Sequence, residues 1–398
     1  MDIYQPAEDS ELLQRFVREH AFGRVLDLGT GSGIQALTAA ENKNVREIIA
    51  ADINPAAITQ LTKKIHEKKL KKIKAIQTDL FSNIDGKFDF IIFNPPYLPQ
   101  DRGIEDHALY GGKKGWEISE RFFLQVNQFL VPSGKIIFLF STLTNKKKIE
   151  EIINQQLLEF QELGTQKLSF EELFVYLIEK SATLRELERQ GIENINYLTH
   201  GKRGDVYTGF LNQNHTIKTH FATKKLLKVA IKVQRKESQA LQRVENEAQW
   251  LRTVNSVNIG PKLFFSGIDY FVCEFIDGTR IEEWIKNKNS TEIKAVFAAA
   301  LQQSFLLDRL KIDKMEMHHP YKHILINDHN RPIFIDFERC HKNNNPKNIT
   351  QLVEYICRLG KERADLNLDQ KELIQLAKNY KKNHLPEDFQ RIVEYLLQ

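Results

Sequence analysis

VLDLGTGSGIQALTAA, residues 25–40, is the stretch that decides the fold of the first part of the chain. A short apolar run leads into the glycine-rich turn DLGTGSG at 27–33, and an apolar helical pattern follows. Glycines let a backbone turn tightly and approach a ligand closely, and the helix start after Gly33 offers free N–H groups. The pattern predicts a strand–turn–helix unit with a ligand-binding turn. Dinucleotide sites look similar, but the spacing here is not GxGxxG.

The same alternation of strands and helices continues to about residue 180. Short apolar runs separated by helical patterns are typical of a mainly parallel sheet with helices on both faces. We therefore expect an α/β domain over residues 1–180, closed by a strand pair. The predicted strands lie near 25–28, 47–52, 75–79, 88–93, 135–140, 160–169 and 172–180.

Carboxylates stand at the carboxyl ends of these predicted strands. Asp52 follows the glycine turn by about 20 residues, where a carboxylate can accept hydrogen bonds from two ribose hydroxyls. Asp79 ends the next strand, in a position suited to an adenine amino group; the alternative is that both are solvated strand-end residues. The candidate cofactor-binding set is Asp27, Gly29, Gly31, Gly33, Asp52, Ile53, Asp79 and Leu80.

Asn94-Pro95-Pro96-Tyr97 follows the apolar strand FDFIIF, so we expect it beside the ligand crevice. Two prolines restrict φ and remove two donors, which leaves the carbonyls of Asn94 and Pro95 free to face a substrate. The Asn94 amide can donate and accept, and Tyr97 can stack on a planar group. This combination suits a planar –NH2 group aimed at an electrophilic methyl. We predict that Asn94, Pro95, Pro96 and Tyr97 are the catalytic residues; a plain Pro-Pro turn is the alternative.

Residues 1–180 resemble the class I S-adenosylmethionine methyltransferases, specifically the HemK/PrmC-type protein-glutamine methyltransferases. Residues 4–10, YQPAEDS, look like the opening motif of the archaeal–eukaryotic branch, and residues 109–123 resemble it too, with Gly111, Gly112 and Gly115. The resemblance implies S-adenosylmethionine as cofactor and the GGQ-loop glutamine of a class-1 peptide release factor as substrate, with lysine a reported acceptor of some members. It also implies a small zinc-binding activator subunit as partner. Glu8 is expected to order the N-terminal segment over the cofactor.

Nucleic-acid amines are the alternative methyl acceptors, because NPPY also occurs in DNA adenine and RNA guanine N-methyltransferases. A base would have to be flipped out of its stack. The run HEKKLKKIK at 66–74 can form a basic patch, but a solvated helix face explains it better. A protein substrate is therefore favoured over nucleic acid as the direct substrate.

From residue 181 the pattern changes to a second predicted domain, residues 181–398. THGKRGDVYTGF at 199–210 reads as strand–glycine turn–strand, with Gly201 and Gly204, and suits a loop that covers phosphates. VAIK places Lys232 on the next strand, where it can reach phosphates and pair with a helical Glu247, or alternatively Glu245. A hinge at Glu274 to Ile276 can bind adenine, which predicts an ATP site.

This second domain resembles atypical protein kinases near the RIO and KEOPS-complex kinases, so we expect an α+β protein-kinase-like fold with ATP and Mg²⁺. Asp336 stands where the metal-binding Asp of DFG is expected, and His323 and His318 stand at the positions of the metal-binding Asn and the catalytic Asp. Glu316 can supply the missing carboxylate, so Glu316 and His318 are the candidate catalytic residues and Asp336 and His323 the candidate metal ligands. The alternatives are an ATPase, a nucleotide-binding pseudokinase or a noncatalytic docking module.

Composition restricts the remaining possibilities. The 398 residues carry 57 Lys and Arg against 52 Asp and Glu, a net charge of +5 that is too small for a chain-wide nucleic-acid field. The longest apolar runs fall far short of the ~20 residues that cross a bilayer, and no signal-peptide pattern begins the chain. Three cysteines make no disulfide framework. These features predict a cytoplasmic protein without a membrane partner: a methyltransferase fused to a kinase-like domain.

Overall fold

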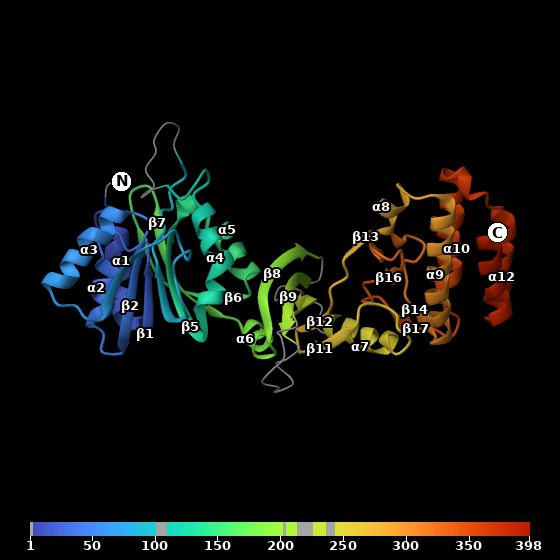
Figure 1. Cartoon of the computed structure of the whole chain (residues 1–398), viewed down its shortest axis with the longest axis horizontal. Helices are drawn as coiled ribbons and strands as arrows, with labels where there is room; N and C mark the ends of the chain where they lie inside the picture. Colours follow the sequence, from blue (N-terminus) through green and yellow to red (C-terminus); the bar gives the residue numbers. More distant parts are fainter. Residues whose placement is uncertain (1–2, 101–109, 202–203, 213–225, 236–242) are drawn as a thin grey trace. The chain divides into compact units, whose positions relative to one another are not determined.

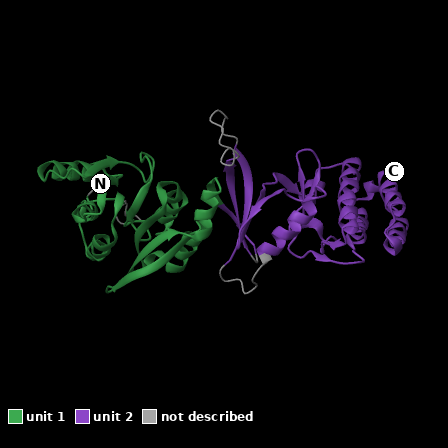
Figure 2. Cartoon of the chain, turned by 90° about the horizontal axis from the view of Figure 1, so that it is seen from below, with its two compact units in different colours: residues 1–196 green, residues 197–398 purple. Residues whose placement is uncertain are grey.

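The chain divides into two compact units, residues 1–196 and 197–398 (Figure 2). The structure is a computed structural model that describes residues 3–100, 110–201, 204–212, 226–235 and 243–398. No helix in these ranges combines the length and the apolar character needed to cross a membrane.

The division between the units falls within strand β8 (Ile192–His200), later than the boundary predicted after residue 180. Helix α6 (Ala182–Arg189) occupies residues that were expected in the second domain. The fully buried Lys180 ammonium donates to the Glu188 carboxylate of this helix at 2.6 Å. This buried pair holds α6 to the end of the first sheet, which is a physical reason for the place of α6 in the first unit.

A seven-stranded sheet with the order β3-β2-β1-β4-β5-β7-β6 forms the centre of the first unit (Figure 1). Strands β1 to β5 run parallel, and β7 pairs antiparallel with β5 and β6, which matches the predicted closing pair. The strand order reverses between β1 and β4, and open α/β sheets bind ligands at such a switch point. The strands are β1 Gly23–Leu28, β2 Val45–Asp52, β3 Ile73–Gln77, β4 Phe88–Phe93, β5 Leu130–Ser141, β6 Leu158–Lys167 and β7 Glu172–Lys180.

Helices cover both faces of this sheet because successive strand residues point to opposite sides. On one face, α1, α2 and α3 contribute residues such as Leu13 and Ala36 to a core that includes Ile92 of β4. On the other, Phe122 of α4 stacks on Phe93, with ring centroids 4.4 Å apart, and α5 packs beside α4. The helices are α1 Glu8–His20, α2 Ile34–Glu41, α3 Pro55–Glu67, α4 Glu117–Phe129 and α5 Lys146–Gln155.

The second unit begins with a five-stranded sheet, β11-β12-β10-β9-β8, against which helix α7 packs. The pairs β9–β10, β10–β12 and β12–β11 are antiparallel. The elements are β9 Gly204–Asn212, β10 Leu226–Gln234, α7 Arg243–Asn255, β11 Leu263–Ser266 and β12 Tyr270–Glu274. The segment ESQALQRVENEAQWLRTV predicts a helix over 237–254, of which residues 237–242 lie outside the described ranges.

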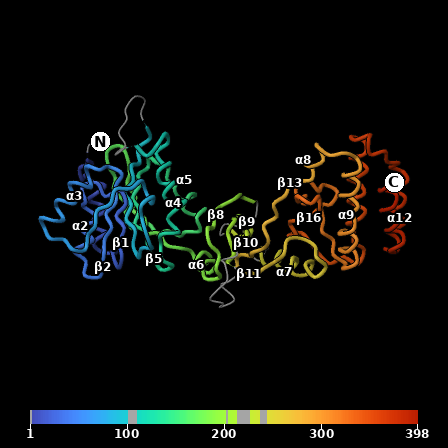
Figure 3. The backbone as a smooth tube through the Cα atoms, viewed as in Figure 1, coloured from blue at the N-terminus to red at the C-terminus, as the bar shows by residue number. Residues whose placement is uncertain are grey.

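The rest of the second unit is mostly helical (Figure 3). Its longest helix, α9, begins at a capping box in which Asn289 and Glu292 satisfy each other's backbone N–H groups. The helices are α8 Ile281–Ile285, α9 Ser290–Arg309, α10 Asn348–Glu362, α11 Gln370–Asn383 and α12 Pro386–Leu397. The short strands between them are β13 Gly278–Arg280, β14 Ile312–Asp313, β15 Ile324–Asn327, β16 Pro332–Phe334 and β17 His341–Lys342.

Candidate active site

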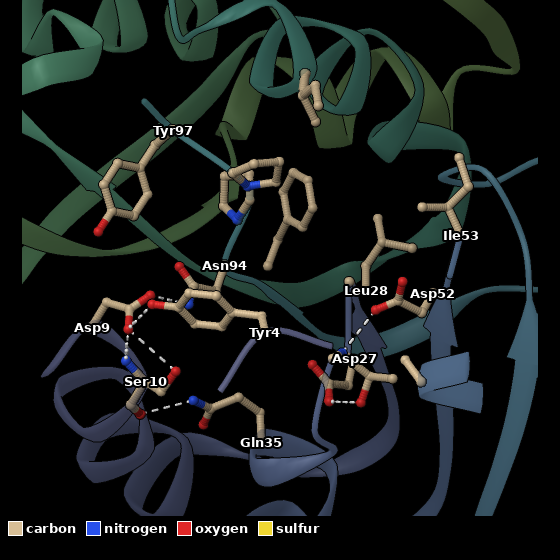
Figure 4. Close-up of a pocket in the computed structure, with 18 of the residues that line it drawn as sticks. Tyr4, Asp9, Ser10, Asp27, Leu28, Gln35, Asp52, Ile53, Asn94 and Tyr97 are labelled. Carbon is tan, nitrogen blue, oxygen red and sulfur yellow. Dashed lines mark hydrogen bonds between the residues drawn. The ribbon is translucent and has the colours of Figure 1, made fainter. Parts of the chain in front are cut away.

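A cavity of about 610 Å³ opens at the carboxyl edge of the first sheet, at the switch point between β1 and β4 (Figure 4). Its walls come from the loops after β1, β2, β3 and β4, from the start of α1, and from Leu168 and Glu171 at the β6–β7 turn. This volume lies in the range that small-molecule and cofactor sites occupy.

The glycine turn forms the floor of this cavity. Gly29, Gly31 and Gly33 all have positive φ, at 68°, 50° and 82°. A Cβ on Gly33 would lie 2.5 Å from Leu61 Cδ1 of α3, whereas a Cβ on Gly31 would meet nothing closer than 4.0 Å. Gly33 is therefore required by its packing, while Gly31 leaves an open floor for a ligand.

Asp27 stabilises the glycine turn through hydrogen bonds. Its carboxylate is 2% exposed and accepts hydrogen bonds from the Thr30 hydroxyl at 2.6 Å and the Ala36 N–H at 2.9 Å. Burial raises the pKa of Asp27 to about 7, against the two hydrogen bonds, which act to lower it. This carboxylate thus ties the turn to the first residues of α2.

Asp52 closes the side of the turn at the end of β2. Its Oδ2 accepts from the Gly31 N–H and its Oδ1 from the Asn54 N–H, both at 2.8 Å. Each carboxylate oxygen has a second lone pair, so Asp52 can still accept from ribose hydroxyls. Ile53 follows it and is 50% exposed along the cavity, where it offers an apolar surface to a base.

Asp79 lines the cavity and pairs with a residue that the sequence did not indicate. Its Oδ2 accepts from Arg121 Nη2 of α4 at 2.8 Å. Leu80, beside it, has φ at 46° and lines the same wall. Arg121 lies 42 residues from Asp79 in the chain, and only the packing of α4 brings the two together.

The NPPY corner faces the turn from the end of β4. Asn94 Nδ2 donates to Asp9 Oδ2 at 2.8 Å, and Asn94 Oδ1 is buried without a hydrogen-bond partner among the described residues (Figure 4). Pro95 is buried, and the Tyr97 ring lines the cavity. Burial, then the charge of Asp9, raises the pKa of Tyr97, so its hydroxyl stays protonated. The corner presents one free acceptor and one aromatic face.

Gly111 and Gly115 support the corner by close backbone approach. The Gly111 N–H donates to the Leu98 carbonyl at 2.9 Å, and a Cβ on Gly111 would lie 2.4 Å from the Pro96 oxygen. A Cβ on Gly115 would lie 2.6 Å from the Tyr97 oxygen. The family resemblance includes residues 109–123, and these close contacts give Gly111 and Gly115 a structural role beside the corner. Leu109 itself lies outside the described residues.

The opening segment of the chain supplies contacts that the sequence interpretation did not assign. Asp9, 4% exposed, accepts from the Tyr4 hydroxyl at 2.9 Å and the Ser10 N–H at 2.6 Å, besides Asn94. We expected Glu8 to order this segment, whereas the hydrogen bonds to Tyr4 and Asn94 are made by its neighbour Asp9. The signal was present as the YQPAEDS motif, yet nothing in one sequence indicates which of its two acids turns inward.

Acidic groups dominate the lining of the cavity. Arg121 is the one basic side chain among the lining residues that the structure describes, and it is paired with Asp79. Such a lining favours a cationic ligand and disfavours a polyanion. The carboxylates are Glu8, Asp9, Asp27, Asp52, Asp79 and Glu171.

In the second unit, Lys232 on β10 and Glu247 on α7 form an ion pair with a short hydrogen bond. Glu247 Oε1 also accepts from the Phe337 N–H at 3.2 Å, and Glu338 Oε2 lies 3.9 Å from Lys232 Nζ. Burial acts to lower the pKa of Lys232, but Glu247 and Asp336 outweigh it and the pKa is raised. The structure thus joins the predicted Lys232 and Glu247 rather than Glu245.

Three further candidates meet nearby. His323 Nε2 lies 3.3 Å from Glu316 Oε2, and His323 Nδ1 lies 3.7 Å from Asp336 Oδ2. Glu247, Asp336 and Glu338 offer carboxylate oxygens within 4.8 Å of one another, a group able to hold a cation. Asp336 belongs to both sets.

His318 lies in a different environment from the other candidates. Its ring packs on His319, with centroids 4.5 Å apart, and its carbonyl accepts from Arg358 of α10. The structure therefore groups His323 with Glu316 and Asp336, whereas His318 contacts Arg358 of helix α10.

The predicted phosphate loop and hinge are only partly visible. The Gly201 N–H donates to the Gly204 carbonyl at 3.0 Å, which closes a tight turn, while Lys202 and Arg203 lie outside the described residues. The Glu274 N–H donates to the Lys262 carbonyl at 2.9 Å. Ile276 follows the end of β12, half-buried.

Comparisons with known proteins concern the first unit. The family model described as "Methyltransferase small domain" matches residues 7–169. A putative protein N5-glutamine methyltransferase of Methanocaldococcus jannaschii is 36% identical over 179 residues, 44% of this chain and 90% of that protein. Methyltransferase HEMK2 of Mus musculus is 33% identical, over 38% of this chain and 76% of that protein.

Two further relatives are matched over different shares of their length. The release factor glutamine methyltransferase of Deinococcus radiodurans is 32% identical over 29% of this chain, but only 44% of that protein is covered. Among solved structures, the E. cuniculi Mtq2–Trm112 complex, described as responsible for methylation of the eRF1 termination factor, is 26% identical. The match covers 46% of this chain and 100% of that one, with a TM-score of 0.37.

The parallel sheet with its glycine turn, strand-end carboxylates and NPPY corner defines a Rossmann-like methyltransferase, so the fold predicted for the first domain is confirmed. Over its N-terminal part the chain belongs to the HemK-type protein-glutamine methyltransferase family.

Proposed function

We propose that the first unit transfers a methyl group from S-adenosylmethionine to the side-chain amide of a protein glutamine, and that the acceptor is the GGQ loop of a class-1 peptide release factor. The observation that carries the proposal is Asn94 Oδ1, which is buried, without a partner among the described residues, and beside the glycine turn. The relatives named as release factor methyltransferases support the choice of substrate.

The residues of the turn fit the cofactor. Gly31 leaves the floor open, Asp52 retains acceptor capacity for a ribose, and Ile53 offers an apolar face to a base. The acidic lining complements a sulfonium cation. When bound, S-adenosylmethionine supplies an electrophilic methyl group, and the protein supplies position.

Asn94 performs the positioning of the nucleophile. An amide nitrogen is a poor nucleophile because its lone pair is delocalised into the carbonyl. Asn94 Oδ1 accepts one N–H of the substrate amide, and the Pro95 carbonyl is the predicted acceptor of the other, so the nitrogen is turned toward the methyl. Tyr97 covers the flat face of the amide, and its raised pKa keeps it neutral there. Holding the reactants in line accounts for most of the rate enhancement in this mechanism.

Nucleic-acid amines remain the second candidate acceptor for the same corner. The carboxylates around the cavity oppose the approach of a phosphate backbone, which supports a protein acceptor instead. A panel of tritiated-methyl assays on release factor, RNA and DNA separates the two. We include in each assay the small zinc-binding activator subunit implied by the resemblance of residues 4–10.

The central test replaces Asn94 with alanine. We expect methyl transfer to the release factor to fall by several powers of ten, since the amide is no longer oriented, while cofactor binding is retained. Asn154→Ala, on the exposed face of α5, is the matched control and is expected to keep full activity. Full activity of Asn94→Ala would refute the proposal.

For the second unit we propose nucleotide binding with Mg²⁺ at Asp336 and His323, with kinase or ATPase chemistry at Glu316. The Lys232–Glu247 pair on β10 and α7, next to the Glu247–Phe337 hydrogen bond, supports a phosphate-binding lysine held in place. Phosphates would have to compete with the carboxylates that now surround this lysine.

Lys232→Ala tests this second proposal. We expect ATP affinity, measured by calorimetry with Mg²⁺, to fall at least tenfold, because a charged phosphate contact is lost. Lys286→Ala, exposed after α8, serves as control. Equal affinity of the Lys232 variant would reject the site. Persistent absence of both phosphate transfer and hydrolysis with radiolabelled ATP would favour the docking-module alternative.

A further inference from the structure

We propose that Asp9 is a positioning residue for methyl transfer: its carboxylate sets the orientation of the Asn94 amide so that Oδ1, and not Nδ2, faces the acceptor. The inference rests on the proposed function of the first unit and deepens it, because it names a group that acts through Asn94.

The Asn94 side chain has no orientation of its own. The two ends of a carboxamide have nearly the same shape, and rotation by 180° exchanges an acceptor for a donor. A donor facing the cavity would leave the N–H of a substrate amide unmatched. Some neighbouring group must therefore distinguish the two ends.

Asp9 makes that distinction. An ionised carboxylate only accepts hydrogen bonds, so the amide end at 2.8 Å from Asp9 Oδ2 has to be Nδ2 (Figure 4). Oδ1 is thereby turned away from Asp9, and it is the end left buried and unpartnered among the described residues. A buried acceptor without a partner is unfavourable, and a substrate N–H removes this cost when it binds.

Asp9 is itself held from several sides. Its Oδ1 accepts from the Tyr4 hydroxyl at 2.9 Å and from the Ser10 N–H at 2.6 Å. The Ser10 carbonyl in turn accepts from Gln35 Nε2 of α2 at 2.9 Å, which joins the start of α1 to the helix that follows the glycine turn. The chain Gln35–Ser10–Asp9–Asn94 therefore links the cofactor side of the cavity to the acceptor side.

The charge of Asp9 adds to the orientation. A carboxylate that accepts from Nδ2 polarises the amide and increases the negative charge on Oδ1. As the bond between the substrate nitrogen and the methyl forms, the methyl–sulfur bond breaks and the nitrogen gains positive charge, which it loses when one N–H proton passes to water. A more negative Oδ1 therefore favours the transition state over the bound amide. Loss of Asp9 should for this reason lower kcat more than it raises KM.

The test measures Asp9→Asn in the full-length chain with the activator subunit and a release factor. An asparagine at this position can donate to Asn94, so the amide is no longer held in one orientation. We expect kcat to fall about 100-fold, as small misplacements of a reacting group do, with KM for both substrates within threefold and S-adenosylhomocysteine binding unchanged. Glu11→Gln, exposed on the same helix, is the matched control.

A double-mutant cycle separates positioning from a merely structural role. If Asp9 acts through Asn94, the Asp9→Asn change lowers kcat in the wild-type background and has little effect once Asn94→Ala is present. Equal losses in both backgrounds, or an unchanged kcat of Asp9→Asn, would overturn the proposal.

Tyr4→Phe is the second variant if Asp9→Asn does not fold. It keeps the ring and removes one hydrogen bond to Asp9, and we expect a several-fold lower kcat that likewise vanishes in the Asn94→Ala background. Full kcat of Tyr4→Phe would then contradict the role of the segment. Absence of any methyl transfer by the wild-type chain is a different result, since it refutes the proposed function and not the role of Asp9 alone.

Discussion

Burial and hydrogen bonding act in opposite directions on the pKa of Asp27. Two donors, Thr30 and Ala36, stabilise its charged form, but burial dominates and raises its pKa to about 7. In the unfolded chain the same group has a pKa near 4. The folded state therefore binds a proton more tightly than the unfolded state between these two values.

A dependence of stability on pH follows from this difference. Because the folded state holds more protons than the unfolded state between pH 4 and 7, the free energy of unfolding decreases as pH rises through this window. At 1.4 kcal/mol per unit, the contribution of Asp27 to this decrease is at most about 4 kcal/mol.

Comparison of Asp27→Asn with wild type isolates the contribution of Asp27 to the pH dependence of stability. We expect the free energy of unfolding of the first unit, measured in urea, to fall in the wild type relative to the variant as pH rises from 4 to 7. Above pH 8 the difference between the two proteins should stay constant. Asp85→Asn, on the exposed surface, should show no such shift. Parallel curves for Asp27→Asn and wild type would contradict the raised pKa.

At the scale of elements, the glycine turn and the NPPY corner are built differently. The turn depends on the start of α2 and its contact with α3, where Gly33 leaves room for Leu61. The corner depends on the backbone of Gly111 to Gly115, which lies against Pro96 and Tyr97. Each feature is thus supported by a segment that is distant in sequence.

Gly33→Ala is expected to destabilise the first unit by about 1–3 kcal/mol, because the new methyl overlaps Leu61 and the residue keeps a positive φ. Gly31→Ala is the matched comparison: it carries the same backbone penalty without the overlap. Denaturant unfolding gives the free energy of unfolding of each variant, and the difference between the two values measures the cost of the overlap with Leu61. Equal stability of the two variants would show that α3 gives way to the methyl.

At the scale of the whole molecule, each unit has its own apolar core. The core of the first unit includes Leu13 and Leu139, and that of the second includes Leu301 and Phe334. Separate cores are expected to unfold in separate transitions, since each loses its own buried surface.

Calorimetry of the full chain tests this expectation. S-adenosylhomocysteine at 100 times its Kd should stabilise only one transition, by about 2.7 kcal/mol. Leu301→Ala should lower the free energy of unfolding in the other transition by roughly 2–5 kcal/mol. A single transition that responds to both changes would mean that the units unfold together.

The sequence alone determined the features that depend on neighbouring residues. The strand–turn–helix around Gly29 to Gly33, the strand-end carboxylates Asp52 and Asp79, and the placement of NPPY after a buried strand all follow from local patterns and parallel-sheet geometry. These patterns were also sufficient to indicate the methyltransferase family, because the chemistry requires those residue types in that order.

The tertiary structure alone decided the pairings across long chain separations. Asp9 meets Asn94 from 85 residues away and Asp79 meets Arg121 from 42, while His323 is grouped with Glu316 and not with His318. The domain limit at β8 also emerged only from packing. A hydrogen bond depends on the position and rotamer of two side chains, and these are set by how distant elements pack, which no local pattern in the sequence contains.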